Sequence, residues 1–181
     1  MIGLLPKSLE VGGTEYKIRS DFRVALLIFE AFNDKELNEY EKIQVCIECL
    51  YEIIPSDIEN AYKKAVWFLE GGNVPKLKPV NRKIFDWKQD ESIIFSAVNK
   101  SAGFETRSEE YLHWWTFLGY FLEIGDGLFS QVVNIRTKRA KGKKLEKWER
   151  EFYNEHRELI DIKKQYSTEE QAEIDRLKAI L

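Results

Sequence analysis

The segment from Tyr111 to Ile124, YLHWWTFLGYFLEI, constrains the fold more than any other part of the sequence. Ten of its fourteen residues are large and apolar or aromatic, and Trp114 and Trp115 are adjacent. On a helix of about 3.6 residues per turn, the polar or small positions fall on a narrow stripe, so protein must cover most of the circumference. We therefore expect this segment to be either the central helix of a core or a surface that binds another subunit.

The rest of the sequence predicts a mainly α fold, a multi-helix bundle with a small N-terminal β-hairpin. Residues 9–19, LEVGGTEYKIR, form two short alternating runs around Gly12 and Gly13, which can adopt the positive φ of a two-residue hairpin turn. We expect one compact unit with four regions: the hairpin and helices in 1–72, a connector in 73–84, a helical part around the aromatic helix in 85–164, and a charged helix in 165–181.

Apolar residues recur at three- and four-residue spacing in the first region, which predicts three helices. Capping residues, a proline and a glycine pair set their expected ends. The first helix is expected to be capped by Ser20 or Asp21 and to end near Asn33-Asp34. The second is expected from about Asn38 to Ile54, with a stop at Pro55, and the third from a Ser56–Glu59 capping box to Gly71-Gly72.

The same signals predict the helices of the second half. A helix is expected after Phe85-Asp86-Trp87 and closes near Ala102-Gly103. The aromatic helix follows, capped by Thr106 with Glu109 or by Ser108 and ended by Gly125-Asp126-Gly127. After a short apolar turn over 128–135 come a helix from Lys147 to Ile162 and a terminal helix that begins with a Ser167–Glu170 capping box.

Residues that could support catalysis or bind a metal are scarce. Cys46 and Cys49 are the only cysteines, and no second CxxC or HxxxH accompanies them, so we interpret them as buried free thiols. His113 lies among tryptophans and His156 in a charged helix; we expect a hydrogen-bonded core residue and a solvated side chain, respectively. The sequence therefore predicts no catalytic, cofactor-binding or metal site, and no enzyme.

Other chemical signatures have structural interpretations as well. Asp90-Glu91, Glu109-Glu110 and Glu169-Glu170 each lie in an expected first helical turn, where the helix dipole favours negative charge. The loop Gly125-Asp126-Gly127 ends a helix instead of starting one, so it lacks the amides that would hold phosphate. No other glycine-rich phosphate loop, nucleophile elbow or metalloprotease motif is present.

Charge is distributed unevenly along the chain. Residues 136–150 hold eight basic and two acidic side chains, whereas residues 1–70 hold eight basic and thirteen acidic ones. Three interpretations of the basic run stay open: a solvated face, contact with an acidic protein partner, and nucleic-acid binding. Nucleic acid is disfavoured because Gly142 interrupts the helix, no helix-turn-helix signature precedes the run, and the chain is net acidic.

Neither the start of the chain nor its apolar stretch indicates a membrane. The opening MIGLLPKSLEV lacks the basic region and long apolar run of a signal peptide. The segment 111–124 is too short to span a bilayer. We therefore expect an intracellular protein with no membrane association.

Five stretches, in this order, carry a resemblance to a known family: LPKSLEVGGTEYKIRSDFRVAL, Phe85-Asp86-Trp87, Tyr111-Leu112-His113-Trp114-Trp115, Ile135-Arg136 with the lysine-rich run after it, and Trp148-Glu149-Arg150-Glu151-Phe152-Tyr153. Together they resemble a protein family of tailed bacteriophages and prophages of Gram-positive hosts. The resemblance covers about Leu5 to Leu159. The chain differs from the family pattern at Gly125-Asp126-Gly127, which stands in place of a proline-containing loop, and in a charged helix beyond Gln165.

The resemblance implies a tail assembly chaperone-like protein, encoded near the tape measure protein and acting in the cytoplasm of the host bacterium. Such chaperones are helical, self-associate, and guard the long apolar tape measure chain until tail-tube subunits assemble around it. The alternatives are a structural component of the tail or head and a nucleic-acid-binding accessory protein. The candidate residues for binding a protein partner are Trp114, Trp115, Phe117, Phe121, Lys138, Arg139, Lys141, Lys143 and Lys144.

Overall fold

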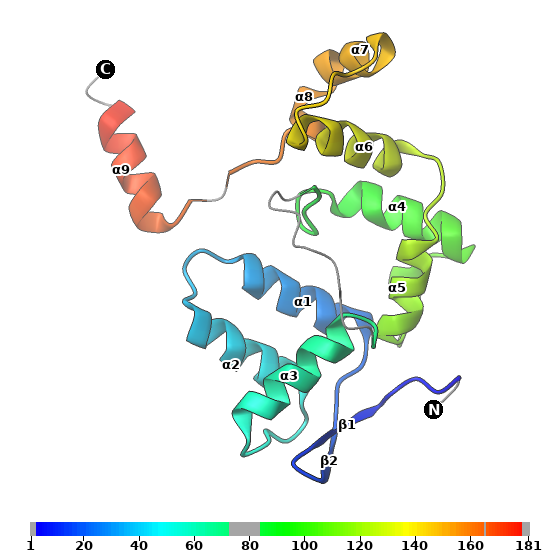
Figure 1. The fold of residues 1–181 in the computed structure, drawn as a ribbon, viewed down its shortest axis with the longest axis vertical. Coiled ribbons are helices and arrows are strands. Elements are labelled where there is room, and N and C mark those ends of the chain that lie inside the picture. The colour runs from blue at the N-terminus through cyan, green and yellow to red at the C-terminus, as the bar shows by residue number, and fades with distance from the viewer. Residues whose placement is uncertain (1–2, 73–83, 165, 179–181) are drawn as a thin grey trace.

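A computed structural model describes residues 3–72, 84–164 and 166–178. Within these ranges the chain is mainly α, with nine α-helices and one two-stranded hairpin (Figure 1). The predicted fold class is therefore confirmed. In chain order the elements are β1 (Ser8–Val11), β2 (Thr14–Lys17), α1 (Phe22–Asn33), α2 (Glu39–Leu50), α3 (Ile58–Leu69), α4 (Glu91–Ala102), the 3₁₀ turn η1 (Thr106–Ser108), α5 (Trp114–Leu122), α6 (Leu128–Ala140), α7 (Lys147–Glu155), α8 (Arg157–Ile160) and α9 (Thr168–Lys178).

The hairpin forms as the glycine pair predicts. β1 and β2 are antiparallel, and Val11 pairs with Thr14 across a turn in which Gly12 and Gly13 have φ of 58° and 80°. Leu9 and Val11 are buried on the inner side of β1, which packs against α3. The hairpin thereby closes one end of the core.

The second helix ends at Leu50, four residues before the predicted end at Ile54. Tyr51 turns to an extended conformation and forms a β-bridge with Ile18. The Arg19 amide donates to the Leu50 carbonyl at 2.7 Å, so a backbone partner from outside the helix satisfies one of its last carbonyls. Pairing with the chain after the hairpin therefore ends α2, and Pro55 does not.

The ends of α1 and α3 differ from the predictions only at one cap. Asp21 is the N-cap of α1, and its carboxylate accepts from the Arg23 amide. For α3 the predicted Ser56–Glu59 capping box is wrong: Asp57 is the N-cap, and its carboxylate accepts from the Asn60 amide at 3.1 Å. The glycine pair after α3 has positive φ at both residues, as expected for a helix end.

The aromatic helix α5 has nine residues, Trp114 to Leu122, and is shorter than the predicted helix, capped by Thr106 or Ser108 and ended by Gly125-Asp126-Gly127. Thr106 and Ser108 belong to η1, and His113 is the N-cap of α5. Its Nδ1 accepts from the Trp115 amide at 3.0 Å, so Nε2 carries the proton and donates to the Pro6 carbonyl at 2.9 Å. The residues just before His113 are not helical, and His113 itself forms a β-bridge with Asp21.

The segment predicted as a short apolar turn, 128–135, is the first part of a regular helix. α6 continues through the start of the basic run to Ala140, and Gly142, with φ of 66°, follows its end. The helix predicted from Lys147 to Ile162 is instead two helices, α7 and α8, which meet at His156. The carbonyls of Leu159 and Ile160 accept from Arg136 of α6, which holds α8 against that helix.

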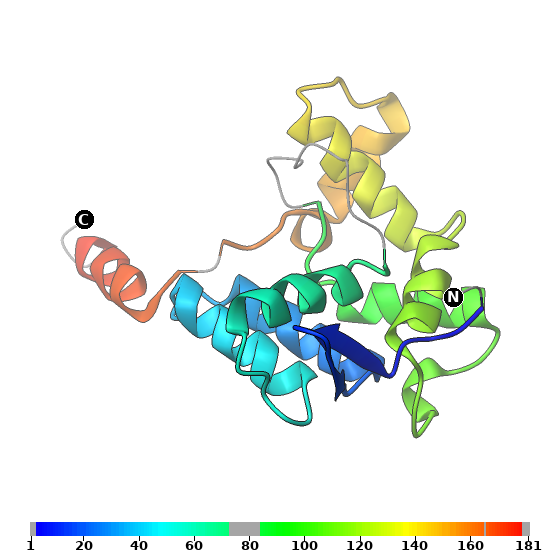
Figure 2. The same ribbon diagram turned by 60° about the horizontal axis from the view of Figure 1, so that its bottom comes forward.

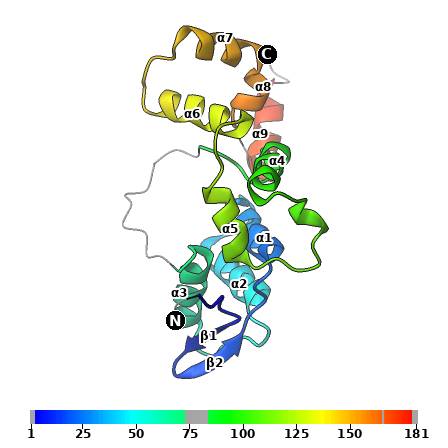
Figure 3. The same ribbon diagram turned by 90° about the vertical axis from the view of Figure 1, so that its right-hand side faces the viewer.

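One cluster of buried residues draws on both 1–72 and 85–164. Phe22 of α1 stacks on Phe117 of α5 with ring centroids 4.5 Å apart, and Phe95 of α4 packs against both rings. α6, α7 and α8 lie at one end of the molecule, opposite the hairpin and α3 (Figure 3). All of the predicted connector except residue 84 lies outside the described residues.

The C-terminal helix α9 stands apart from the rest of the molecule (Figures 1 and 2). Its predicted capping box is confirmed: the Ser167 amide donates to the Glu170 carboxylate at 2.9 Å, and the Glu170 amide donates to Ser167 Oγ at 3.1 Å. None of its described residues is buried. This helix therefore contributes nothing to the core.

Candidate partner-binding surfaces

The adjacent tryptophans of α5 bind the end of another helix of the same chain. The Trp114 indole N–H donates to the Leu69 carbonyl at 2.9 Å, and the Trp115 indole N–H donates to the Phe68 carbonyl at 2.8 Å. These carbonyls are among the last four of α3, which have no partner within the helix. Two neighbouring indoles thus satisfy two successive carbonyls.

Two of the four aromatic candidates do not belong to an accessible surface. Trp114 and Phe117 are 1% and 0% exposed, because α1, α3 and α4 cover α5 from several sides. This corrects their assignment to a shared surface. Trp115 and Phe121 are half-buried: Trp115 packs against Trp67 and Phe68, and Phe121 lies against aromatic rings before α4 and on α6.

The glycine pair after α3 gives this packing a direct test. A Cβ at Gly72 would lie 2.7 Å from the Trp115 ring, and Gly72 has φ of 79°. We therefore expect Gly72→Ala to lower the free energy of unfolding by about 1–3 kcal/mol through strain and displacement of the ring. Gly119→Ala is the matched control, since nothing lies within 4 Å of its added Cβ and alanine favours the helix. Urea denaturation measures both; equal stability of the two variants would contradict this packing.

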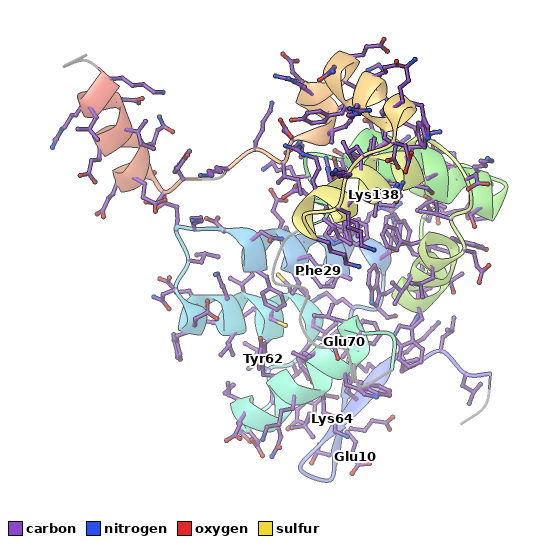
Figure 4. The ribbon with its side chains drawn as sticks, turned by 45° about the horizontal axis from the view of Figure 1, so that its top comes forward. Glu10, Phe29, Tyr62, Lys64, Glu70 and Lys138 are labelled. Atoms are coloured by element: carbon purple, nitrogen blue, oxygen red, sulfur yellow. The ribbon has the colours of Figure 1, made fainter. Side chains whose placement is uncertain are left out.

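The basic candidates on α6 are used within the chain. Lys138, labelled in Figure 4, forms a 2.6 Å ion pair with Glu149, whose side chain is fully buried. Hydrogen bonds from Lys138, the Glu146 amide and Asn134 lower the pKa of this carboxyl, the Lys138 bond most of all. Arg139 pairs with Asp161 and lies over the Tyr153 ring, 4.2 Å from its centroid. Both cations therefore hold α7 and α8 against α6.

The remaining basic candidates form an exposed surface at the α6–α7 turn. Lys141, Lys143 and Lys144 are exposed, and so is Trp148, at 52%. The sequence predicts no binding role for Trp148, because this residue fits the apolar spacing of a helix and its exposure depends on how α7 packs. We call this feature the basic hairpin surface, after the helical hairpin of α6 and α7 and not the β-hairpin; it comprises Lys141, Lys143, Lys144, Lys147, Trp148 and Arg150.

A groove of about 870 Å³ lies along α1, opposite the segment that leads into α4. Its apolar lining comes from α1, from Trp87 and Phe95, and from Tyr166 just before α9. Leu27 is 53% exposed and Tyr166 is 45% exposed, which is unusual for large apolar side chains that share one hollow. We call this feature the α1 groove; its apolar residues are Phe22, Leu26, Leu27, Trp87, Phe95 and Tyr166.

Charged side chains hold the walls of the α1 groove in place. Lys88 and Glu30 form a 2.6 Å ion pair between the two walls, and the hydrogen bond from Lys88 to Glu30 is the main cause that raises the pKa of this lysine. Arg23 donates to the carbonyls of Arg107 and Glu109 at 3.0 and 2.7 Å. The groove is thus an apolar floor between ordered polar edges, an arrangement that suits an amphipathic helix.

Neither the thiols nor the acidic groups assemble into a reactive site in the described part of the chain. Cys46 is buried, which raises its pKa to about 12, and burial also raises the pKa of Cys49. His113 is buried as the α5 cap, and this burial lowers its pKa. No group of three or more histidine, cysteine, aspartate or glutamate side chains among the described residues is placed to hold a metal ion.

A comparison with protein-family models shows which family the chain belongs to. The model for Bacteriophage Gp15 protein matches residues 1–167. The chain belongs to this bacteriophage family. Searches of curated proteins and of solved structures found no significant match. The Gp15 match ends one residue before α9 begins, so the groove and the basic hairpin surface lie within the Gp15 region and α9 lies outside it.

Two of the stretches that resemble a phage family contain residues that hold the fold together. Asp86 Oδ1 accepts from the amides of Lys88 and Gln89, which shapes the turn into α4. Arg136 binds Asp90 with two hydrogen bonds of 2.5 and 2.9 Å, and both side chains are buried.

No helix among the described residues has the length and apolar character needed to cross a membrane.

Proposed function

We propose that this Gp15-family protein is a non-enzymatic tail assembly chaperone that acts in the host cytoplasm. In this proposal it binds an amphipathic helical segment of the tape measure protein in the α1 groove. The observation that carries the proposal is the α1 groove, in which exposed Leu27 and Tyr166 lie in one hollow with the apolar side chains of Leu26, Trp87 and the buried Phe22 and Phe95. The resemblance to tail-module proteins supplies the partner.

The mechanism is burial of apolar surface that would otherwise aggregate. Each Å² of apolar surface removed from water contributes about 25 cal/mol. A partner helix whose apolar side chains contact Leu27 and Tyr166 would place its polar face outward, between the edges that carry Arg23 and Lys88. Tail-tube subunits would then displace the chaperone, because it covers the same apolar stripe that the tube must enclose.

Co-expression with the tape measure protein of the same tail module tests the proposal. We expect this chain to keep the tape measure protein soluble and to co-purify with it. Leu27→Asp should weaken the complex by about tenfold or more, because a carboxylate would be buried against apolar surface. Ile53→Asp is the matched control, since Ile53 is 73% exposed at the α2–α3 turn, outside the groove.

Two outcomes would contradict the chaperone proposal. The proposal is wrong if co-expression of this chain does not change the solubility of the tape measure protein and the two proteins do not co-purify. Stoichiometric retention in purified phage particles would favour a structural tail or head component, because a chaperone leaves before assembly ends.

A nucleic-acid-binding accessory role has one observation in its favour, the exposed cations of the basic hairpin surface. Affinity for DNA at physiological salt that falls steeply as salt rises would support it. Neutralising Lys143 and Lys144 should then abolish that affinity, whereas neutralising Lys138 would act chiefly through the fold.

A further inference from the structure

α9 is a helix without a surface to pack on. It has eleven residues, and Leu177 is 58% exposed on it. Its described contacts with the body are at its start, where Thr168 donates to Glu36 and Glu170 lies 4.0 Å from Lys35. An isolated helix of this length is marginal in water, so α9 gains stability by docking.

One face of α9 combines apolar and acidic side chains. Ile174 and Leu177 are three residues apart, which places them together on a helix; Glu173 is four residues before Leu177, and Glu169 lies about one helical turn before Glu173. The described helix carries four carboxylates and two basic side chains. A fitting surface would therefore offer an exposed apolar anchor among cations.

The basic hairpin surface has this composition. Its five cations are exposed. Of the nearby acidic side chains, Glu149 is buried and paired with Lys138, Glu151 lies 4.0 Å from Lys147, and Glu146 is exposed, so cations predominate. Trp148 provides the apolar anchor, and tryptophan is enriched among residues that dominate binding energy at interfaces. Its charge and apolar content both complement α9.

Within one molecule the two surfaces are apart. The start of α9 is held next to the loop after α1 by the hydrogen bonds from Thr168 to Glu36, and the helix stands to one side of α6 and α7, apart from them (Figures 1 and 2). Turning it back would break these contacts. We propose that α9 of one copy binds the basic hairpin surface of a second copy, Ile174 and Leu177 covering Trp148 while Glu169 and Glu173 face the lysines.

The donor and acceptor surfaces are different, so the contact is heterologous and every copy can donate one helix and accept another. The inference does not depend on which partner that groove binds, because it concerns the purified chain alone.

Sedimentation or light scattering of the purified full chain tests the contact. We expect concentration-dependent association in low salt that weakens by about tenfold or more as salt is raised, because exposed charges are screened. Lys143→Glu with Lys144→Glu should abolish association, and so should Glu169→Lys with Glu173→Lys. Combining all four changes should restore it, because opposite charges face each other again.

The matched control is Lys63→Glu with Lys64→Glu, an identical charge reversal at two exposed positions on α3, where Lys64 is labelled in Figure 4. It should leave association unchanged. A full chain that stays monomeric at high concentration in low salt would overturn the proposal. The proposal is also wrong if the chain still associates after the charge reversal on the basic hairpin surface or after the one on α9, or if the variant with all four changes does not associate. DNA binding by a strictly monomeric chain would likewise contradict it.

Discussion

Replacing Arg136 by methionine is expected to lower the free energy of unfolding by about 3–5 kcal/mol. Arg136 is 6% exposed and donates to both carboxylate oxygens of Asp90, which is fully buried. It also donates to the carbonyls of Ile84, Leu159 and Ile160. Methionine fills a similar volume but leaves the Asp90 charge without its cationic partner and three carbonyls without this donor.

Urea denaturation of Arg136→Met and of Arg139→Met separates burial from charge. Both residues lie on α6 and both pair with an aspartate, but Arg139 and Asp161 are largely exposed, so its loss should cost about 1 kcal/mol or less. Adding Asp90→Leu to Arg136→Met should recover part of the stability, because the unpaired charge is removed together with its partner. Similar destabilisation by Arg136→Met and Arg139→Met would contradict the anchoring role.

Features that depend on neighbouring residues could be predicted from the sequence. The hairpin turn at Gly12-Gly13, the end of α3 at Gly71-Gly72 and the capping box before α9 follow from the backbone preferences of a few adjacent residues. These signals establish the mainly α class and most of the helices. They do not depend on what packs against each element.

Features that depend on distant pairing could not be predicted in this way. α2 ends early because Tyr51 pairs with Ile18, and α5 starts late because His113 pairs with Asp21. The apolar spacing within either segment contains no sign of these bridges. The α1 groove has the same origin, since it exists only where α1 meets the segment around Trp87.

The basic run shows why composition alone could not separate binding residues from structural ones. Lys138 and Lys143 are the same residue type five positions apart. The first is paired with buried Glu149, and the second is exposed in the turn after α6. Their difference lies in the position of α7, which a count of charges does not contain.

The adjacent tryptophans of α5 lead to the other large expected effect. Trp114→Ala should lower the free energy of unfolding by about 3–5 kcal/mol, because it removes a fully packed side chain from the core. It also leaves the Leu69 carbonyl at the end of α3 without its donor. Trp148→Ala is the control of equal chemistry: its side chain is 52% exposed, so we expect a change of about 1 kcal/mol or less.

Trp114→Phe keeps the comparison measurable if the alanine variant does not fold. Phenylalanine retains most of the apolar surface and loses the indole N–H, so its cost should be about 1–3 kcal/mol from the unpaired carbonyl and the smaller ring. Thermal or urea unfolding of all three variants ranks them. If Trp114→Ala unfolds like the native chain, Trp114 does not hold the core together. If the cost falls from Trp114→Ala to Trp114→Phe to Trp148→Ala, the aromatic segment is the centre of the core.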